Sequence, residues 1–482
     1  MGTQEYGLII GGCHQGAASG DTFEVLAPED ERLLASVARA GPADVELAVA
    51  AARQGFSQWS ALAPREREAA LLRAAELVAA EGEARFLDNL IDESGSVVLK
   101  ARGEIAYTVD LLRTAAGEAR RLYGDTFPND SPDRISMVFR EPMGVVAVVS
   151  PYNAPLSLLT KMTAFPLAAG NSVVIKPSEE TPLTALALGQ VLLDAGLPAE
   201  AISVLPGFGA DCGAPLVAHP DIDCIALTGS TQTGVRIGIE AMKHMRRCQL
   251  ELGGKSALLV LRDADPVQAA EIAAQGIFTH AGQICMANSR IVVERPVYAE
   301  FIAALKQAAE AIHLGDLRDE RTRYGPLINR AAADKVMSHI NDAVAGGAQL
   351  LTGGEIDHGL TIKPTVILEP DRKGSLWREE SFGPLASVVA VDDLDAAIAV
   401  ANDSEYGLSA AVLTHNVQWG FRAARGIHAG SVHIGMHAFQ SNALAPIGGY
   451  RMSGIGRSGG KYSTEEFTEL KWISVSLEDA GP

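Results

Sequence analysis

Short apolar runs that alternate with longer helical stretches dominate the middle of the chain. Segment 183–195 is one of these helical stretches, because its apolar residues recur at helical spacing. Four β-branched runs bounded by turn residues predict buried strands at 145–149, 172–175, 202–205 and 224–227. Apolar strands that alternate with helices predict a parallel sheet covered on both faces.

A second α/β series begins near Ser256. Its pattern predicts strands at 257–261, 290–293 and 385–391, and helices from 266, over 297–313 and over 394–402. The chain is therefore expected to be an α/β protein with two Rossmann-like parallel-sheet domains.

Both ends of the chain differ from this middle part. Residues 1–120 are expected to be helix-rich, with helices over 43–60 and 64–84. The polar, proline-containing stretch 125–133 predicts an exposed turn or arm. The tail 466–476 ends in a run typical of an edge strand, which predicts an oligomer contact.

Composition excludes several classes of protein. With 482 residues the chain is long enough for two or three domains, and its net charge of −19 argues against binding to nucleic acid. No apolar run approaches the roughly 20 residues of a membrane span, and no signal peptide is expected. The five cysteines are scattered, which disfavours disulfides and zinc and favours a reducing cytoplasm.

Two residues suggest the chemistry of a two-step reaction. Cys285 in Gly-Gln-Ile-Cys is a possible sulfur nucleophile, and Glu251 in Glu-Leu-Gly-Gly-Lys is a possible base that activates water. His280 precedes Cys285 by five residues on an expected helix and is not expected to face it, which disfavours a Cys/His hydrolase.

Two glycine-rich segments depart from the common nucleotide-binding motifs, and a third suits phosphate. Gly254-Lys-Ser lacks the earlier glycine of a P-loop, since position 249 is Gln, and 207–213 misses the spacing of G-x-G-x-x-G. The segment 228–234 lies between a strand and a helix, and its Gly, Ser and Thr residues suit a helix N-terminus that binds phosphate. A well-capped βα turn explains that segment equally well.

Seven motifs together resemble the aldehyde dehydrogenase superfamily, in its order and spacing, over nearly the whole chain. They are Pro151-Tyr-Asn-Ala-Pro155, Lys176-Pro-Ser-Glu179, the 228–234 turn, Glu251-Leu-Gly-Gly-Lys255, Gly282-Gln-Ile-Cys285, Glu380-Ser-Phe-Gly-Pro384, and Pro446-Ile-Gly-Gly449 with Ser453-Gly-Ile-Gly-Arg457. The resemblance implies an NAD-binding domain at 1–120 and 142–253, a catalytic domain at 254–446, and a bridging β oligomerisation arm at 121–141 and 463–482.

The resemblance also implies roles for the catalytic residues. Cys285 would attack the aldehyde carbon, the Asn153 amide and the Cys285 N–H would hold the oxyanion, and Glu251 would activate water for hydrolysis. No metal is implied.

The expected cofactor is NAD, with NADP less favoured. Glu179 would accept hydrogen bonds from the adenosine ribose hydroxyls and would repel a 2′-phosphate. The other residues placed at the cofactor by the resemblance are Lys176, Pro151, Gly229, Ser230, Glu380 and Phe382.

Departures from the common pattern concern the substrate. Tyr152 replaces Trp, Leu227 replaces Phe, and a lysine stands at position 161, where Met162 takes the usual lysine position. Ala154, Lys161 and the ending 466–475 resemble the vanillin, benzaldehyde and salicylaldehyde dehydrogenase branch. An aromatic aldehyde is therefore expected, with Lys161 and Tyr152 as substrate contacts, unless Lys161 merely extends to solvent.

Three alternatives remain open at this point. An aliphatic aldehyde or semialdehyde dehydrogenase is one, a CoA-acylating member is a second, and a non-catalytic protein of the same fold is a third. The chain is expected to form a homodimer or homotetramer.

Overall fold

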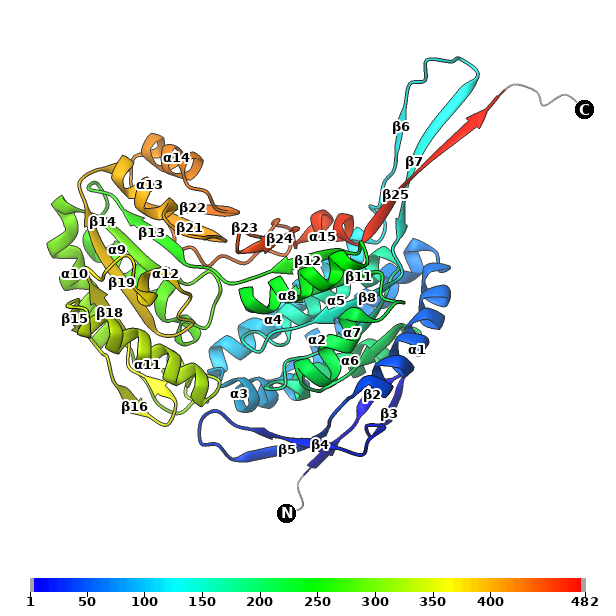
Figure 1. Cartoon of the computed structure of the whole chain (residues 1–482), viewed down its shortest axis with the longest axis horizontal. Coiled ribbons are helices and arrows are strands. Elements are labelled where there is room, and N and C mark those ends of the chain that lie inside the picture. The colour runs from blue at the N-terminus through cyan, green and yellow to red at the C-terminus, as the bar shows by residue number, and fades with distance from the viewer. Residues whose placement is uncertain (1–3, 478–482) are drawn as a thin grey trace, which may run out of the picture.

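The computed structural model describes residues 4–477 and consists of two α/β lobes and a projecting arm (Figure 1). Each lobe is built on a mostly parallel sheet, which confirms the predicted fold class. The carboxyl edge of one sheet and the amino edge of the other supply the residues of the site described below.

The larger lobe contains an eight-stranded sheet of order β24-β12-β11-β8-β9-β10-β2-β3. Its strands are β2 (Leu8–Ile10), β3 (Cys13–Gln15), β8 (Val145–Val149), β9 (Ser172–Lys176), β10 (Ile202–Val204), β11 (Cys224–Thr228), β12 (Arg247–Glu251) and β24 (Gly454–Ile455). Strands β10-β9-β8-β11-β12 are parallel, and their order in the chain is 3-2-1-4-5. The strand order reverses between β8 and β11, and ligands of such sheets bind beside the carboxyl ends of the strands at this point.

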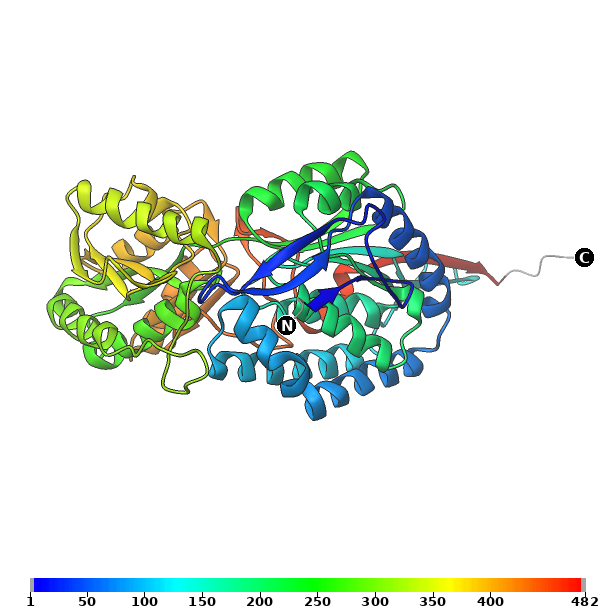
Figure 2. The same cartoon turned by 90° about the horizontal axis from the view of Figure 1, so that it is seen from below.

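Helices cover both faces of this sheet, as Figure 2 shows from below. Val146 and Val148 point into one hydrophobic core and Val145 and Ala147 into the other, because alternate side chains of a strand point to opposite faces. The helices of this lobe are α1 (Pro42–Ser60), α2 (Pro64–Gly82), α3 (Asp88–Ser94), α4 (Val98–Glu118), α5 (Ser157–Ala169), α6 (Pro182–Asp194), α7 (Ala214–Ala218), α8 (Thr231–Lys243) and α15 (Gly460–Glu466).

The smaller lobe contains a seven-stranded sheet of order β15-β18-β19-β14-β13-β21-β22. Its strands are β13 (Ser256–Val260), β14 (Asn288–Glu294), β15 (Gln349–Thr352), β18 (Thr365–Leu368), β19 (Leu385–Val391), β21 (Ser409–Leu413) and β22 (Ser431–Ile434). Its helices are α9 (Pro266–Phe278), α10 (Arg295–Glu310), α11 (Arg330–Ala345), α12 (Ser375–Arg378), α13 (Leu394–Asn402) and α14 (Val417–Gly426). Two small ladders complete it, β16 (Ile356–His358) with β17 (Thr361–Ile362) and β20 (Tyr406–Gly407) with β23 (Tyr450–Arg451).

The arm is a three-stranded antiparallel sheet that extends away from the body (Figure 1). It contains β6 (Asp125–Phe127), β7 (Arg134–Pro142) and β25 (Thr468–Ser476), and β25 pairs with β7 along its whole length. The polar stretch at 125–133 and the C-terminal tail therefore belong to one element.

The N-terminal part differs from the prediction. Residues 4–38 form strands β1 (Gln4–Tyr6), β2, β3, β4 (Thr22–Leu26) and β5 (Leu33–Ala38), so the chain is helix-rich only from Pro42 onwards. Strands β1, β3 and β4 are short and largely exposed, and they lack the continuous apolar runs that identify the central strands.

Candidate active site

The segment before Cys285 has an unusual backbone. Helix α9 ends at Phe278, and His280, Ala281 and Gly282 then adopt left-handed conformations, with φ of 51°, 54° and 67°. A Cβ atom at Gly282 would lie 2.0 Å from the Gly383 carbonyl oxygen, so only glycine fits there. The prediction that His280 lies on a helix is wrong, because its backbone is left-handed. His280 and Cys285 both line the cavity described below.

Most other predicted site residues lie at the carboxyl ends of neighbouring parallel strands. Strand β12 ends at Glu251, β9 ends at Lys176, Gly229 and Ser230 follow β11, and 151–153 follow β8. In contrast, Cys285, Glu380 and Phe382 precede strands β14 and β19 of the other sheet. The two sheets therefore bring the predicted residues together from opposite sides.

A cavity of about 900 Å³ lies between these elements. Cys285, Glu251, Asn153 and Lys161 all line it. Apolar side chains form much of the remaining wall, among them Tyr107, Ala154, Leu158, Phe278, Met286, Leu408, Phe439 and Ile447. A volume of several hundred Å³ with mostly apolar walls and a few convergent polar groups is typical of a small-molecule site.

Cys285 is half-buried at this cavity. Burial raises the pKa of its thiol to about 12, and the negative charges of Glu380 and Glu251 act in the same direction. The ammonium group of Lys161 opposes these effects. The resting thiol is therefore protonated at neutral pH.

Glu251 is buried and forms an ion pair with Lys161, whose Nζ atom lies 3.6 Å from Glu251 Oε1. Within residues 4–477, that oxygen has no hydrogen-bond donor. Lys161 is only 3% exposed, so its side chain does not extend to solvent. A carboxylate that is desolvated yet not saturated with hydrogen bonds is available to accept a proton from water.

Asn153 connects the two sides of the cavity. Its Nδ2 atom donates a hydrogen bond of 2.8 Å to the carbonyl oxygen of Gln283, two residues before Cys285. Gln283 is itself fixed by Pro326 and Ile328. The Asn153 carboxamide is thus held beside the nucleophile loop.

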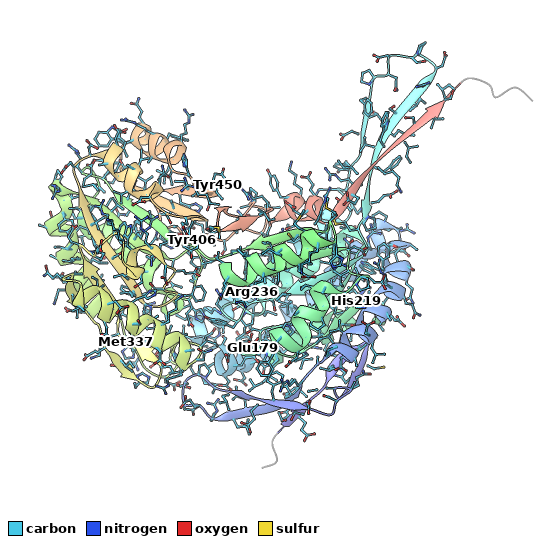
Figure 3. All side chains as sticks on the ribbon, in the orientation of Figure 1. Glu179, His219, Arg236, Met337, Tyr406 and Tyr450 are labelled. Carbon is cyan, nitrogen blue, oxygen red and sulfur yellow. The ribbon has the colours of Figure 1, made fainter. Side chains whose placement is uncertain are left out.

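The predicted cofactor residues form two groups. At the sheet edge, Lys176 Nζ lies 2.9 Å from Glu179 Oε2, and Ser230 caps helix α8 by accepting the N–H of Thr233 at 3.2 Å. In Figure 3, Glu179 lies below α8, on the part of its lobe nearest to the other lobe.

The second group comes from the smaller lobe. Glu380 Oε1 accepts the N–H of Gly254 at 2.9 Å, and burial raises the pKa of its carboxyl group. The Phe382 ring packs edge-on against Tyr152, with 6.0 Å between ring centroids. Tyr152 thus contacts the Phe382 side of the site and is absent from the cavity lining given above.

Several cavity residues were missed by the sequence analysis. Helix α4 contributes Lys100, Glu104 and Tyr107 to the wall, and Arg323 lies at the same cavity. No motif marks them, because on a helix such residues look like part of an ordinary amphipathic pattern.

None of the helices within residues 4–477 combines the length and the apolar character of a membrane-spanning helix. The same part of the chain contains no cluster of His, Cys, Asp and Glu suited to hold a metal ion.

Comparison with known proteins gives a consistent result. The aldehyde dehydrogenase family model matches residues 15–473. A vanillin dehydrogenase of Pseudomonas fluorescens is 39% identical over 97% of both chains, and a glutarate-semialdehyde dehydrogenase of Pseudomonas putida is 35% identical over 96% of both. The crystal structure of an NAD-dependent aldehyde dehydrogenase from Sinorhizobium meliloti superposes with a TM-score of 0.97 at 35% identity, covering 100% of this chain and 96% of that one.

Proposed function

The chain belongs to the aldehyde dehydrogenase family and is an NAD(P)-dependent enzyme, and on this basis we propose that it oxidises an aromatic aldehyde to the acid with NAD. The observation that carries the proposal is the convergence of Cys285, Glu251 and Asn153 on one cavity with apolar and aromatic walls. The domain limits expected from the sequence are part of the proposal, and every strand of the seven-stranded sheet falls within 254–446.

The first step is addition of Cys285 to the aldehyde. The Cys285 thiol loses its proton to solvent, with the Lys161 ammonium group favouring the thiolate, and the sulfur attacks the carbonyl carbon. The C=O π electrons move to the oxygen, which becomes an alkoxide. The Asn153 Nδ2–H and the Cys285 backbone N–H stabilise this alkoxide, because neutral donors fixed in a desolvated site need no reorganisation.

NAD, when bound, supplies the acceptor for the hydride that leaves the substrate carbon. Residues of this chain fit such a group: the carboxyl ends of β8 and β11, where the strand order reverses, the capped N-terminus of α8 for the pyrophosphate, and Glu380 for a ribose. The Lys176–Glu179 pair would hold the adenosine ribose, and Pro151, after β8, and Phe382, before β19, would also contact the cofactor.

The second step is hydrolysis of the acyl-sulfur bond on Cys285. Glu251 takes a proton from water, and the hydroxide adds to the acyl carbon. Collapse then expels the Cys285 thiolate, which regains a proton from Glu251, and releases the acid. The overall balance is aldehyde, NAD⁺ and water to acid, NADH and a proton.

The cavity wall supports an aromatic substrate. The rings of Tyr107, Phe278 and Phe439 line the cavity, and Ala154 leaves space beside Asn153. Lys161 lies at the wall with its charge paired to Glu251, so it can reach a phenolic oxygen only by sharing its ammonium group with that carboxylate.

The proposed roles are tested with two variants. Glu251→Gln should form NADH in a single burst and then accumulate the acyl-enzyme, detected as an acyl adduct on Cys285 by mass spectrometry. Cys285→Ala should give no NADH and should bind NAD as the wild type does. Steady turnover in either variant would remove that residue from its role.

A semialdehyde is the second candidate substrate. Arg323 lies at the cavity and forms no ion pair in the described part of the chain, so it could bind a substrate carboxylate. The test measures kcat/KM in the wild type and in Arg323→Met for benzaldehyde, vanillin, salicylaldehyde, succinate semialdehyde and hexanal. It distinguishes a semialdehyde substrate from an aromatic one. A semialdehyde substrate predicts a loss confined to the acidic aldehydes, and a requirement for CoA would identify an acylating enzyme.

A further inference from the structure

Helix α4 contributes a lysine and a glutamate, one turn apart, to the wall of the cavity. Lys100 Nζ donates to Glu104 Oε2 at 2.5 Å and to the Asn153 backbone oxygen at 2.9 Å. The Glu104 side chain is 3% exposed and that of Lys100 is 17% exposed. This pair therefore connects α4 directly to the residue proposed to bind the oxyanion.

The other carboxylate oxygen of Glu104 holds the beginning of helix α5. Oε1 accepts the backbone N–H groups of Leu156 and Ser157, both at 2.9 Å, and the Ser157 hydroxyl at 3.3 Å. Helix α5 has no side-chain cap of its own. Glu104 thus acts as an N-cap supplied by a neighbouring helix, where a negative charge also suits the helix dipole.

These contacts fix the segment 153–157 at both ends to a single turn of α4. At its start, Lys100 holds the Asn153 carbonyl, and at its end Glu104 holds Ser157. The Asn153 side chain is held separately, because its Nδ2 donates a hydrogen bond to the Gln283 carbonyl oxygen. Both the backbone and the carboxamide of Asn153 are therefore immobilised.

We propose that Lys100 and Glu104 are positioning residues that set the Asn153 carboxamide for oxyanion binding. This inference rests on the proposed role of Asn153. Its physical basis is that an oxyanion donor acts only within a narrow range of distance, so that a displacement of about 1 Å can cost about 100-fold in rate. Since α4 also carries Gly103 and Tyr107 on the cavity wall, it joins the substrate-facing surface to the oxyanion donor.

The test is a double-mutant cycle of Lys100→Met with Asn153→Ala, measured as kcat/KM for the aldehyde in the assembled enzyme with saturating NAD. Lys100→Met should lower kcat and kcat/KM together by about 100-fold. In the Asn153→Ala background the same substitution should add little further loss, because the donor it positions is gone. Glu104→Gln keeps the shape of the side chain and removes its charge, so it should give a smaller loss of kcat/KM. It takes the place of Lys100→Met in the cycle if that variant does not fold.

Glu93→Gln is the matched control. Glu93 on α3 caps α6 in the same way, accepting the N–H groups of Leu183 at 2.8 Å and Thr184 at 2.7 Å, and is buried. It should change the melting temperature and leave kcat/KM for the aldehyde unchanged.

The outcomes are distinct. Normal activity of Lys100→Met, or a full loss that persists in the Asn153→Ala background, overturns the positioning role alone. Normal activity of Asn153→Ala overturns the proposed oxyanion site and this inference with it.

Discussion

At the residue scale, neighbouring charges of opposite sign act on the pKa of the nucleophile Cys285. Glu251 and Glu380 disfavour the Cys285 thiolate, whereas Lys161 favours it and also pairs with Glu251. The resting arrangement therefore keeps the sulfur protonated. Such an arrangement protects a reactive thiol from solution oxidants until substrate and cofactor are present, since the thiolate is the reactive form.

The first prediction concerns alkylation of Cys285 without cofactor. Because burial raises the pKa of this thiol to about 12, the thiolate fraction should rise about tenfold per pH unit from pH 7 to 10, with no plateau. Glu251→Gln removes a negative charge that raises this pKa, so it should speed alkylation at a given pH. Peptide mass spectrometry after iodoacetamide treatment measures the rate, and a plateau near pH 8 would contradict the burial argument.

A second prediction at this scale concerns the choice of cofactor. Glu179 is held by Lys176, and its carboxylate would repel a 2′-phosphate. Glu179→Gln should lower the preference for NAD over NADP by about tenfold, which corresponds to about 1.4 kcal/mol. The ratio of kcat/KM for the two cofactors measures this, with Glu200→Gln on the same lobe as control. An unchanged ratio would mean that selection occurs elsewhere.

At the scale of elements, the strands carry the site. Glu251, Ser230, Asn153 and Lys176 are near in space only because the ends of parallel strands β12, β11, β8 and β9 share one sheet edge. The apolar runs predicted β8, β9 and β11, and the motifs lie where those runs end, so this part of the geometry followed from the sequence. Strand β12 was not predicted, because the polar residues Arg247 and Gln249 interrupt its apolar pattern.

Contacts between separate elements did not follow from the sequence. The Lys161–Glu251 pair joins α5 to β12, and Lys100–Asn153 joins α4 to the loop after β8. Neither pair has a sequence spacing that predicts it. The left-handed turn at His280 was missed for a different reason, because His and Ala rarely adopt positive φ and only the fold enforces it.

The linker between the two sheets gives a third prediction. A Cβ at Gly253 would lie 2.5 Å from the movable Glu380 carboxylate, whereas a Cβ at Gly254 would lie 2.4 Å from the Cys285 carbonyl oxygen, which is backbone. Gly253→Ala should therefore raise the KM for NAD, and Gly254→Ala should reduce kcat more severely. Gly16→Ala, which meets no atom within 4 Å, is the control. Equal effects of the first two substitutions would contradict this distinction.

For the whole molecule, the unexplained feature is the arm. Its three strands leave the body with large apolar side chains in solvent, including Trp472, 65% exposed, and Leu470, 58% exposed. A small sheet with apolar residues on its surface is not stable alone in water and is a template for association. The sequence predicted that the tail is an edge strand. Because β25 pairs with β7, its exposed apolar side chains also form part of a face of the three-stranded arm.

The fourth prediction follows from this exposed surface. Trp472 packs against Phe127 with ring centroids 6.0 Å apart, and burying one such ring against a second copy removes about 150–250 Å² of it from water. At about 25 cal/mol per Å² this is several kcal/mol per subunit, so an oligomer should depend on it strongly. Trp472→Glu should shift the mass measured by light scattering at micromolar concentration towards the monomer. Leu26→Glu, an equally apolar but distant exposed site at 45% exposure, should leave the mass unchanged. If both variants keep the wild-type mass, the arm is not the surface that holds the subunits together, and its apolar residues require another partner.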